Sequence, residues 1–99
     1  MDLAFDGFDW DEGNSTKCES HGLSIAEIEA MFRIEPRVAP DLAHSVDEQR
    51  LIAVGRTGAG RPIFVAFTLR ERDGSRLIRP VSARYMHLRE IRRYEAPGS

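Results

Sequence analysis

The feature that most constrains the fold is the apolar run Pro62–Leu69, with the sequence PIFVAFTL. Two shorter strand-like runs flank it, residues 51–55 and 76–82. Turn sequences separate the three runs: Thr57–Gly60 on one side, and Asp73-Gly74, a strong hairpin signal, on the other. The sequence therefore predicts an antiparallel meander with the apolar run in the middle of the sheet.

The last of the three runs contains Pro80, which has no backbone N–H. A proline cannot donate to the hydrogen-bond ladder of a sheet, so within strands it is found at bulges and edges. We therefore expect this strand to be bulged at Pro80 or to lie at an edge of the sheet.

The clearest helix signal is a capping box, Ser24-Ile25-Ala26-Glu27. Apolar residues then recur on one helical face until Pro36, which predicts a helix over about residues 25–34. A helix with a weaker signal is expected before it, from a cap at Asp11 to Gly22, which can adopt the left-handed conformation that ends helices.

The remaining segments complete the predicted order. Residues 3–10 favour a short irregular strand, and residues 36–48 favour a loop with at most a short extended piece around Val38. A last helix is expected from about Met86 to Glu95. Its inward-facing residues are expected to be Leu88, Ile91 and Tyr94. The order is β-α-α-β-β-β-α, which predicts an α+β fold: a small antiparallel sheet of three to four strands with helices on one face.

The chain has 99 residues, the size of one domain, and no linker or repeat divides it. No apolar run approaches the roughly 18 residues that a membrane-spanning helix needs. The first residues are acidic rather than basic, so neither a signal peptide nor an anchor is expected. The single Cys18 cannot form an internal disulfide or a cysteine zinc motif. We therefore expect one domain over residues 1–99, located in the cytoplasm.

The net charge of −2 hides a strong asymmetry between the two halves of the chain. Residues 1–49 hold 3 basic and 12 acidic residues, a net charge of −9, whereas residues 50–99 hold 11 arginines and 4 acidic residues, a net charge of +7. Of the 14 basic residues 13 are arginine, whose planar guanidinium binds phosphate and carboxylate through paired hydrogen bonds. We expect the second half to bind an anionic partner, above all RNA. Pairing between the acidic and the basic half is the alternative.

Six arginines fall on or beside the outer strands of the predicted meander, where alternate side chains on one face can converge. They are Arg50, Arg56, Arg61, Arg76, Arg79 and Arg84. An unpaired guanidinium is too costly to bury, so some of them should lie on the sheet face that the helices leave open and contact a phosphate backbone. The alternative for each arginine is an ion pair with an acidic residue of the N-terminal half.

Histidine exchanges protons near neutral pH, and RNA cleavage needs a group that deprotonates the 2′-hydroxyl or protonates the leaving oxygen. His87 is the best-placed histidine because it follows Arg84 and Tyr85 in the basic C-terminal region. If the last helix begins near Ala83, Arg84 and His87 share one helical face. No spacing indicates a metal site, and Gly58-Ala59-Gly60 is a turn rather than a phosphate-binding loop, so we expect no metal or cofactor.

Taken in order, these residues resemble the BrnT family, toxins of type II toxin–antitoxin pairs. The resemblance covers about residues 8–94 and rests on these motifs: Phe8–Asn14, Lys17, His21-Gly22-Leu23-Ser24, Arg50, Val54-Gly55, Arg79–His87, Glu90 and Tyr94. Each motif alone is weak, but their order and spacing are specific. Ser20 departs from the family pattern, in which lysine or arginine more often precedes His-Gly.

The resemblance implies a RelE-like fold, a metal-independent ribonuclease that blocks translation, and a heteromeric complex with a cognate BrnA-type antitoxin. In the implied mechanism Arg56, Arg79 and Arg84 hold the scissile phosphate. His87 or Glu90 exchanges protons, and the ring of Tyr85 can stack on a base. Further residues expected to contact RNA are Arg50, Arg61, Arg76, Lys17 and His21.

Two interpretations of other classes stay open. A RelE-like domain can bind RNA or protein without cleaving anything, because a fold does not dictate a function. A small structural protein can also self-associate through its oppositely charged halves. Growth arrest with cut transcripts, growth arrest without cutting, and no arrest distinguish the three.

Overall fold

The computed structural model describes residues 3–34, 36–44 and 48–95. Its elements in chain order are β1 (Gly7–Phe8), α1 (Glu12–Glu19), α2 (Ile25–Arg33), β2 (Arg37–Pro40), the short 3-10 helix η1 (Leu42–His44), β3 (Leu51–Arg56), β4 (Pro62–Arg72), β5 (Ser75–Tyr85) and α3 (Leu88–Glu95). The strands form one sheet in the order β1-β5-β4-β3-β2. β4 therefore lies in the middle, and both the predicted central strand and the α+β class are confirmed.

The sheet has five strands rather than the expected three to four. β2 pairs with β3 along its whole length, so the short extended piece expected around Val38 is an edge strand. β1 is only two residues long and pairs with β5 in parallel, which makes the sheet mixed rather than antiparallel. Both edge strands lie within segments where the sequence predicted a short strand or an extended piece, but the strands with which they pair were not predicted.

β4 and β5 form a long hairpin around Asp73 and Gly74, whose φ angles are 51° and 81°. Positive φ at both central residues is the requirement of the tight hairpin turn that an Asp-Gly sequence favours. Farther along the hairpin, the register between β4 and β5 shifts: Ala66 pairs with Ser82 and Phe67 with Pro80, which leaves Val81 as a bulge. The bulge expected at the proline is confirmed.

Asn14 supplies the hydrogen bonds that Pro80 cannot make. In the ladder between β1 and β5 the N–H of Asp9 donates to the carbonyl of Ile78 at 2.8 Å, and the next bond would need an N–H at position 80. The buried Asn14 amide instead donates to the carbonyl oxygens of Asp9 and Pro80, at 3.0 and 2.9 Å. Its Oδ1 accepts the N–H of Asp11 at 2.7 Å, within the capping box of α1. One side chain thus ends a strand pair and begins a helix.

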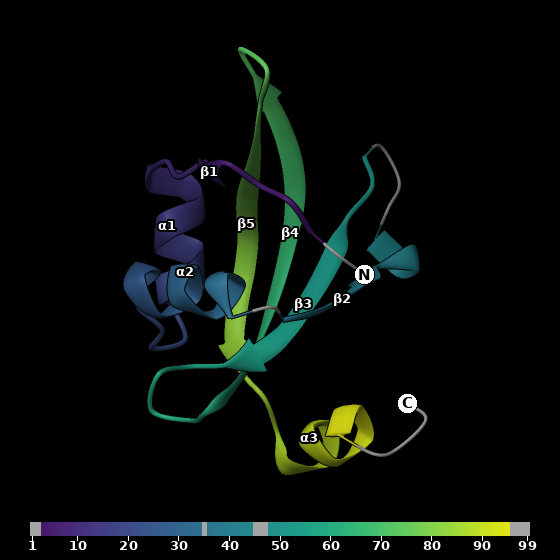
Figure 1. Cartoon of the computed structure of the whole chain (residues 1–99). Helices are drawn as coiled ribbons and strands as arrows, with labels where there is room; N and C mark the ends of the chain where they lie inside the picture. The colour runs from purple at the N-terminus through teal and green to yellow at the C-terminus, as the bar shows by residue number, and fades with distance from the viewer. Residues whose placement is uncertain (1–2, 35, 45–47, 96–99) are drawn as a thin grey trace.

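α1 and α2 lie together on one face of the sheet (Figure 1). Ser24 and Glu27 form the predicted capping box at the start of α2. Phe32 of α2 packs edge-to-face on Phe67 of β4, with 5.1 Å between the ring centroids. The hydrophobic core fills this layer and comprises Cys18, Leu23, Ile28, Met31, Phe32, Leu51, Ala53, Ile63, Val65, Phe67, Ile78 and Ala83.

α3 lies apart from that layer, beyond the end of β5 (Figure 1). α3 begins at Leu88, two residues after the expected start at about Met86, and because β5 continues to Tyr85 it does not begin near Ala83, as a shared helical face of Arg84 and His87 required. Leu88 is 62% exposed rather than inward-facing, whereas Ile91 is half-buried, and the side chain of Tyr94 lies outside the described residues. No helix in the described part of the chain has the length and apolar character needed to cross a membrane.

Candidate functional site

A row of side chains crosses four strands on the face of the sheet opposite α1 and α2. Arg37 of β2 pairs with Val54 of β3. Val54 in turn pairs with Phe64 of β4, and Phe64 with Arg84 of β5. Directly paired residues of neighbouring strands present their side chains on the same face. Two arginines therefore frame two apolar side chains on the open face.

The position of Gly55 shows which residues of β3 point toward the helices and which point to the open face of the sheet. A Cβ built on Gly55 would lie 2.6 Å from the Cγ atom of Met31 in α2, so this position faces the helices. Successive residues of a strand point to opposite faces. Its neighbours Val54 and Arg56 therefore point to the open face, and Arg56 joins the same surface as the row.

Arg84 is held by contacts on two sides. Its guanidinium lies over the ring of Phe64, 4.5 Å from the centroid. It also donates two hydrogen bonds, of 2.7 and 2.8 Å, to the carboxylate of Glu90 in α3. The same carboxylate accepts the backbone N–H of His87 at 3.0 Å. The predicted helical spacing of Arg84 and His87 is not observed, since Arg84 lies in β5; Glu90 links the two residues instead.

The contacts of Glu90 also set its protonation. The hydrogen bonds from Arg84, and after them the N–H of His87, lower the pKa of Glu90 from its usual 4.5 to about 2. A carboxylate with so low a pKa is ionised at neutral pH and is a poor proton acceptor there. His87, the other proton carrier that the resemblance implied, is exposed.

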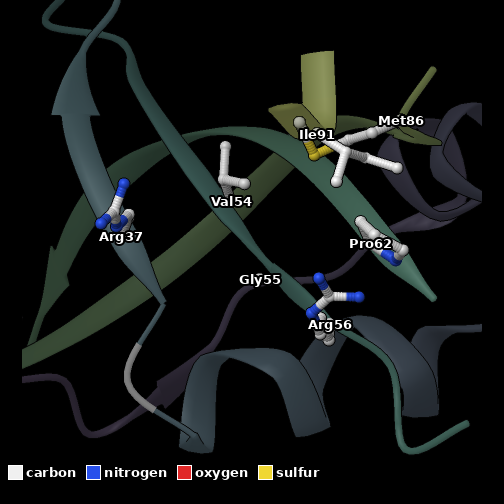
Figure 2. A pocket seen from close by; sticks show the side chains of 7 residues that line it. All are labelled: Arg37, Val54, Gly55, Arg56, Pro62, Met86 and Ile91. Atoms are coloured by element: carbon white, nitrogen blue, oxygen red, sulfur yellow. The ribbon is translucent and has the colours of Figure 1, made fainter. Parts of the chain in front are cut away.

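A pocket of about 310 Å³ lies beside the row, between β2, β3 and α3 (Figure 2). Its lining comprises Arg37, Val54, Gly55, Arg56, Pro62, Met86 and Ile91. In Figure 2 the guanidinium groups of Arg37 and Arg56 lie apart from the cluster that Met86 and Ile91 form. Arg56 also donates to the carbonyl of Gly60 at 2.9 Å. The pocket therefore combines cationic and apolar walls.

Three further predicted residues gather at the same end of the sheet, on the side of the helices. The guanidinium of Arg61 lies over the ring of Tyr85, 3.6 Å from its centroid. A Cβ built on Gly22 would lie 3.8 Å from the Tyr85 ring, so the loop that contains His21 passes beside it. Arg61 and Tyr85 thus form a pair separate from the group around Arg84, and the exposed His21 is next in sequence to the glycine that approaches it.

Arg79 is engaged elsewhere. Its guanidinium donates to Asp9 at 3.4 Å and to Asp11 at 2.7 Å, at the start of α1. Asp9 is buried and also accepts a hydrogen bond from Arg72 at 3.3 Å. Arg79 precedes Arg84 by a stretch of β5 that spans roughly 15 Å at about 3.3 Å per residue. The structure therefore does not bring Arg79 into the group around Arg84.

The other predicted RNA contacts are dispersed. Arg50 pairs with Asp41 at 3.5 Å, at the end of β3 remote from Arg56. Arg76 lies at the tip of the β4–β5 hairpin, 3.9 Å from Glu71. Lys17 is exposed on α1. The structure does not gather these three into one site.

Two residues of the row were not predicted as site residues. Arg37 belongs to a segment that was expected to be a loop with at most a short extended piece around Val38, and its pairing with β3 brings it to the open face. Phe64 belongs to the central apolar run, where a core position was the natural expectation, yet its ring supports Arg84. No local signal distinguishes either residue, because both depend on their neighbours across the sheet.

An open sheet face lined by arginines, beside an exposed histidine, defines a small domain suited to act on an anionic polymer such as RNA. Within the described residues, no group of three or more His, Cys, Asp and Glu side chains is placed to hold a metal ion. The sequence matches, over residues 10–90, the family model described as the ribonuclease toxin BrnT of type II toxin–antitoxin systems. The chain therefore belongs to the BrnT family of ribonuclease toxins. No curated protein matches it in a sequence comparison.

Proposed function

We propose that this toxin cleaves RNA without a metal ion, at the junction between β5 and α3, and that this cleavage blocks translation. The observation that carries the proposal is the convergence of Arg84, Glu90 and His87 at that junction. Arg56 on the same face adds a second positive charge.

Cleavage of this kind uses a nucleophile within the RNA itself. The 2′-hydroxyl oxygen attacks the adjacent phosphorus, and the bond from phosphorus to the 5′-oxygen of the next nucleotide breaks. One proton leaves the attacking hydroxyl and another goes to the leaving oxygen, so the products are a 2′,3′-cyclic phosphate and a 5′-hydroxyl. Negative charge grows on the phosphate oxygens in the transition state, and positioned donors stabilise it.

The residues at the junction match these requirements. We assign the charge stabilisation to Arg84 and Arg56, and the proton exchange to His87. Glu90 is assigned to orientation: it fixes the guanidinium of Arg84 and the start of α3, and its low pKa keeps it ionised. Preorganised charge of this kind needs no rearrangement when the phosphate arrives.

For the remaining candidates we propose supporting roles. Arg79 has a structural role, because its contacts to Asp9 and Asp11 tie β5 to the start of α1. A second contact zone for RNA is formed on the helix side of the sheet end by Arg61, Tyr85 and His21. The sequence-based prediction that RNA contacts Arg50, Arg76 and Lys17 is retained.

We propose a BrnA-type antitoxin as the neutralising partner, in a heteromeric complex in the cytoplasm, where the transcripts are. The net charge of +7 on residues 50–99 supports an acidic contact segment in the partner. Such a segment would cover the arginines of the open face and would exclude RNA from them.

Incubation of the purified toxin with single-stranded RNA in EDTA tests the proposal. We expect products with 2′,3′-cyclic phosphate and 5′-hydroxyl ends, and loss of cleavage when antitoxin is added. Activity that disappears in EDTA and returns with Mg²⁺ would contradict metal independence. Growth arrest with intact transcripts would favour a non-catalytic binding module instead.

A further inference from the structure

The pocket beside the row has two kinds of wall. Val54, Met86 and Ile91 contribute apolar surface, whereas Arg37 and Arg56 contribute guanidinium groups (Figure 2). Arginine side chains only donate hydrogen bonds. A ligand that contacts both kinds of wall would therefore join an apolar body to a group that accepts hydrogen bonds or carries negative charge.

The volume of the pocket limits which ligands it can hold. Its volume of about 310 Å³ lies at the lower limit of small-ligand sites, which range over roughly 300–1,000 Å³. One nucleotide unit has the required composition, because its planar base stacks on apolar side chains and its phosphate accepts hydrogen bonds from arginine. The family membership, which makes RNA the substrate, favours this ligand over an acidic peptide.

The position of the pocket agrees with that ligand. Val54 in the pocket wall and Arg84 at the proposed cleavage site lie in one row across the sheet, with Phe64 between them. Neighbouring strands are about 4.8 Å apart, so β3 and β5 are separated by roughly 10 Å. A nucleotide close to the scissile phosphate along the same RNA strand can reach the pocket.

We propose that the pocket is a nucleotide subsite, in which the base of one RNA nucleotide packs against Val54, Met86 and Ile91 while its phosphate binds Arg37. The proposal rests on the ribonuclease function proposed above, and it adds Arg37 as an RNA-binding residue.

Methyl NMR of the full chain labelled at its 3 methionines tests the subsite directly. Met86 lines the pocket, and the buried Met31 on the helix side of the sheet is a built-in control. Titration with guanosine 5′-monophosphate should shift the Met86 methyl signal and leave Met31 in place. Ribose 5-phosphate, which lacks a base, and guanosine, which lacks a phosphate, should each bind at least about 10-fold more weakly, because each loses one set of contacts.

Two variants complete the experiment. Arg37→Gln should weaken nucleotide binding about 10- to 100-fold, since it removes charge-assisted hydrogen bonds. Arg33→Gln is the matched control, because Arg33 is an exposed arginine of α2 paired with Glu29. It should bind the nucleotide like the wild type.

Three results would contradict the subsite proposal. They are a Met86 methyl signal that does not shift when the nucleotide is added, equal affinity for ribose 5-phosphate and the nucleotide, and an Arg37→Gln variant that binds the nucleotide with wild-type affinity. A Met86 signal that responds to an acidic antitoxin peptide but to no nucleotide would also overturn it, in favour of a protein contact. Cleavage by a toxin whose Met86 stays silent counts against the subsite alone. Nucleotide binding without cleavage counts against the proposed function alone.

Discussion

The carboxylate of Glu90 accepts two hydrogen bonds from the guanidinium of Arg84, at 2.7 and 2.8 Å, and thereby joins β5 to α3. This ion pair attaches the first turn of α3 to the end of the sheet. The position of His87 depends on it as well, because its backbone N–H donates to the same carboxylate.

Replacement of Glu90 by glutamine should change how stability depends on pH. A carboxyl group whose pKa is lowered on folding stabilises the folded state above its ordinary pKa, and that contribution is lost as the pH falls through the folded value. For Glu90 the window runs from 4.5 down to about 2. We expect the wild type to lose about 1 kcal/mol more than Glu90→Gln across this window, a modest value because the pair is partly exposed.

Urea unfolding at several pH values measures this difference. Glu71→Gln is the matched control, since Glu71 is an exposed carboxylate 3.9 Å from Arg76 at the hairpin tip. Parallel pH profiles for the wild type and Glu90→Gln would show that the ion pair with Arg84 does not form in solution.

The buried amide of Asn14 gives a second prediction. Asn14→Ala leaves the carbonyl oxygens of Asp9 and Pro80 without their donor, and each buried group left unpaired costs about 1–3 kcal/mol. We expect the free energy of unfolding to fall by about 3 kcal/mol in urea denaturation. Ser15→Ala, which removes only an exposed hydroxyl, should change it by less than about 0.5 kcal/mol. A loss below about 1 kcal/mol for Asn14→Ala would refute this account of Pro80.

The close approach of α2 to β3 gives a third prediction. A Cβ at position 55 would lie 2.6 Å from Cγ and 3.0 Å from Sδ of Met31, so Gly55→Ala must displace that side chain. Overpacking of this kind typically costs about 1–3 kcal/mol of unfolding free energy. Gly58→Ala is the control, because nothing lies within 4 Å of its Cβ position. Thermal unfolding of the two variants should separate them clearly, and equal melting temperatures would show that Met31 moves aside at no cost.

Competition between RNA and the antitoxin gives a fourth prediction. If both bind the arginines of the open face, a catalytically inactive toxin should release labelled RNA when antitoxin is added. The association rate of the antitoxin should fall as salt rises, because screening weakens attraction between complementary charges. Antitoxin binding that ignores salt and leaves RNA bound would place the antitoxin on another surface.

Much of the fold was accessible from sequence because its signals are local. The capping box at Ser24 and Glu27, the Asp73-Gly74 turn and the apolar run of β4 each specify a structure within a few residues. At the edges the sequence predicted only a short strand within residues 3–10 and an extended piece around Val38. The pairing of β1 and β2 was not predicted, because their partner strands are distant in the chain, and β5 continues three residues beyond its expected end through its ladder with β4.

The site was predictable in composition but not in arrangement. The excess of arginine pointed to an anion-binding face, and Arg84, His87 and Glu90 do meet at one junction. An ion pair with the acidic half was the alternative for every arginine, but the sequence does not indicate that Arg79 is held by Asp9 and Asp11, since these residues are brought together by the β1–β5 pairing. Arg37 was missed for the same reason.

The most direct test of the central claim is the rate of RNA cleavage by purified His87→Ala under single-turnover conditions. His87 is exposed, and in the described contacts only its backbone N–H donates to another residue's side chain, so the variant should fold and bind antitoxin normally. Loss of a positioned proton carrier typically slows a reaction by about 10²- to 10⁴-fold, and we predict a loss in that range. Arg70→Ala, which removes an arginine paired with Glu48 away from the junction, should cleave at the wild-type rate. A His87→Ala toxin that cleaves RNA within about threefold of the wild type would contradict the account.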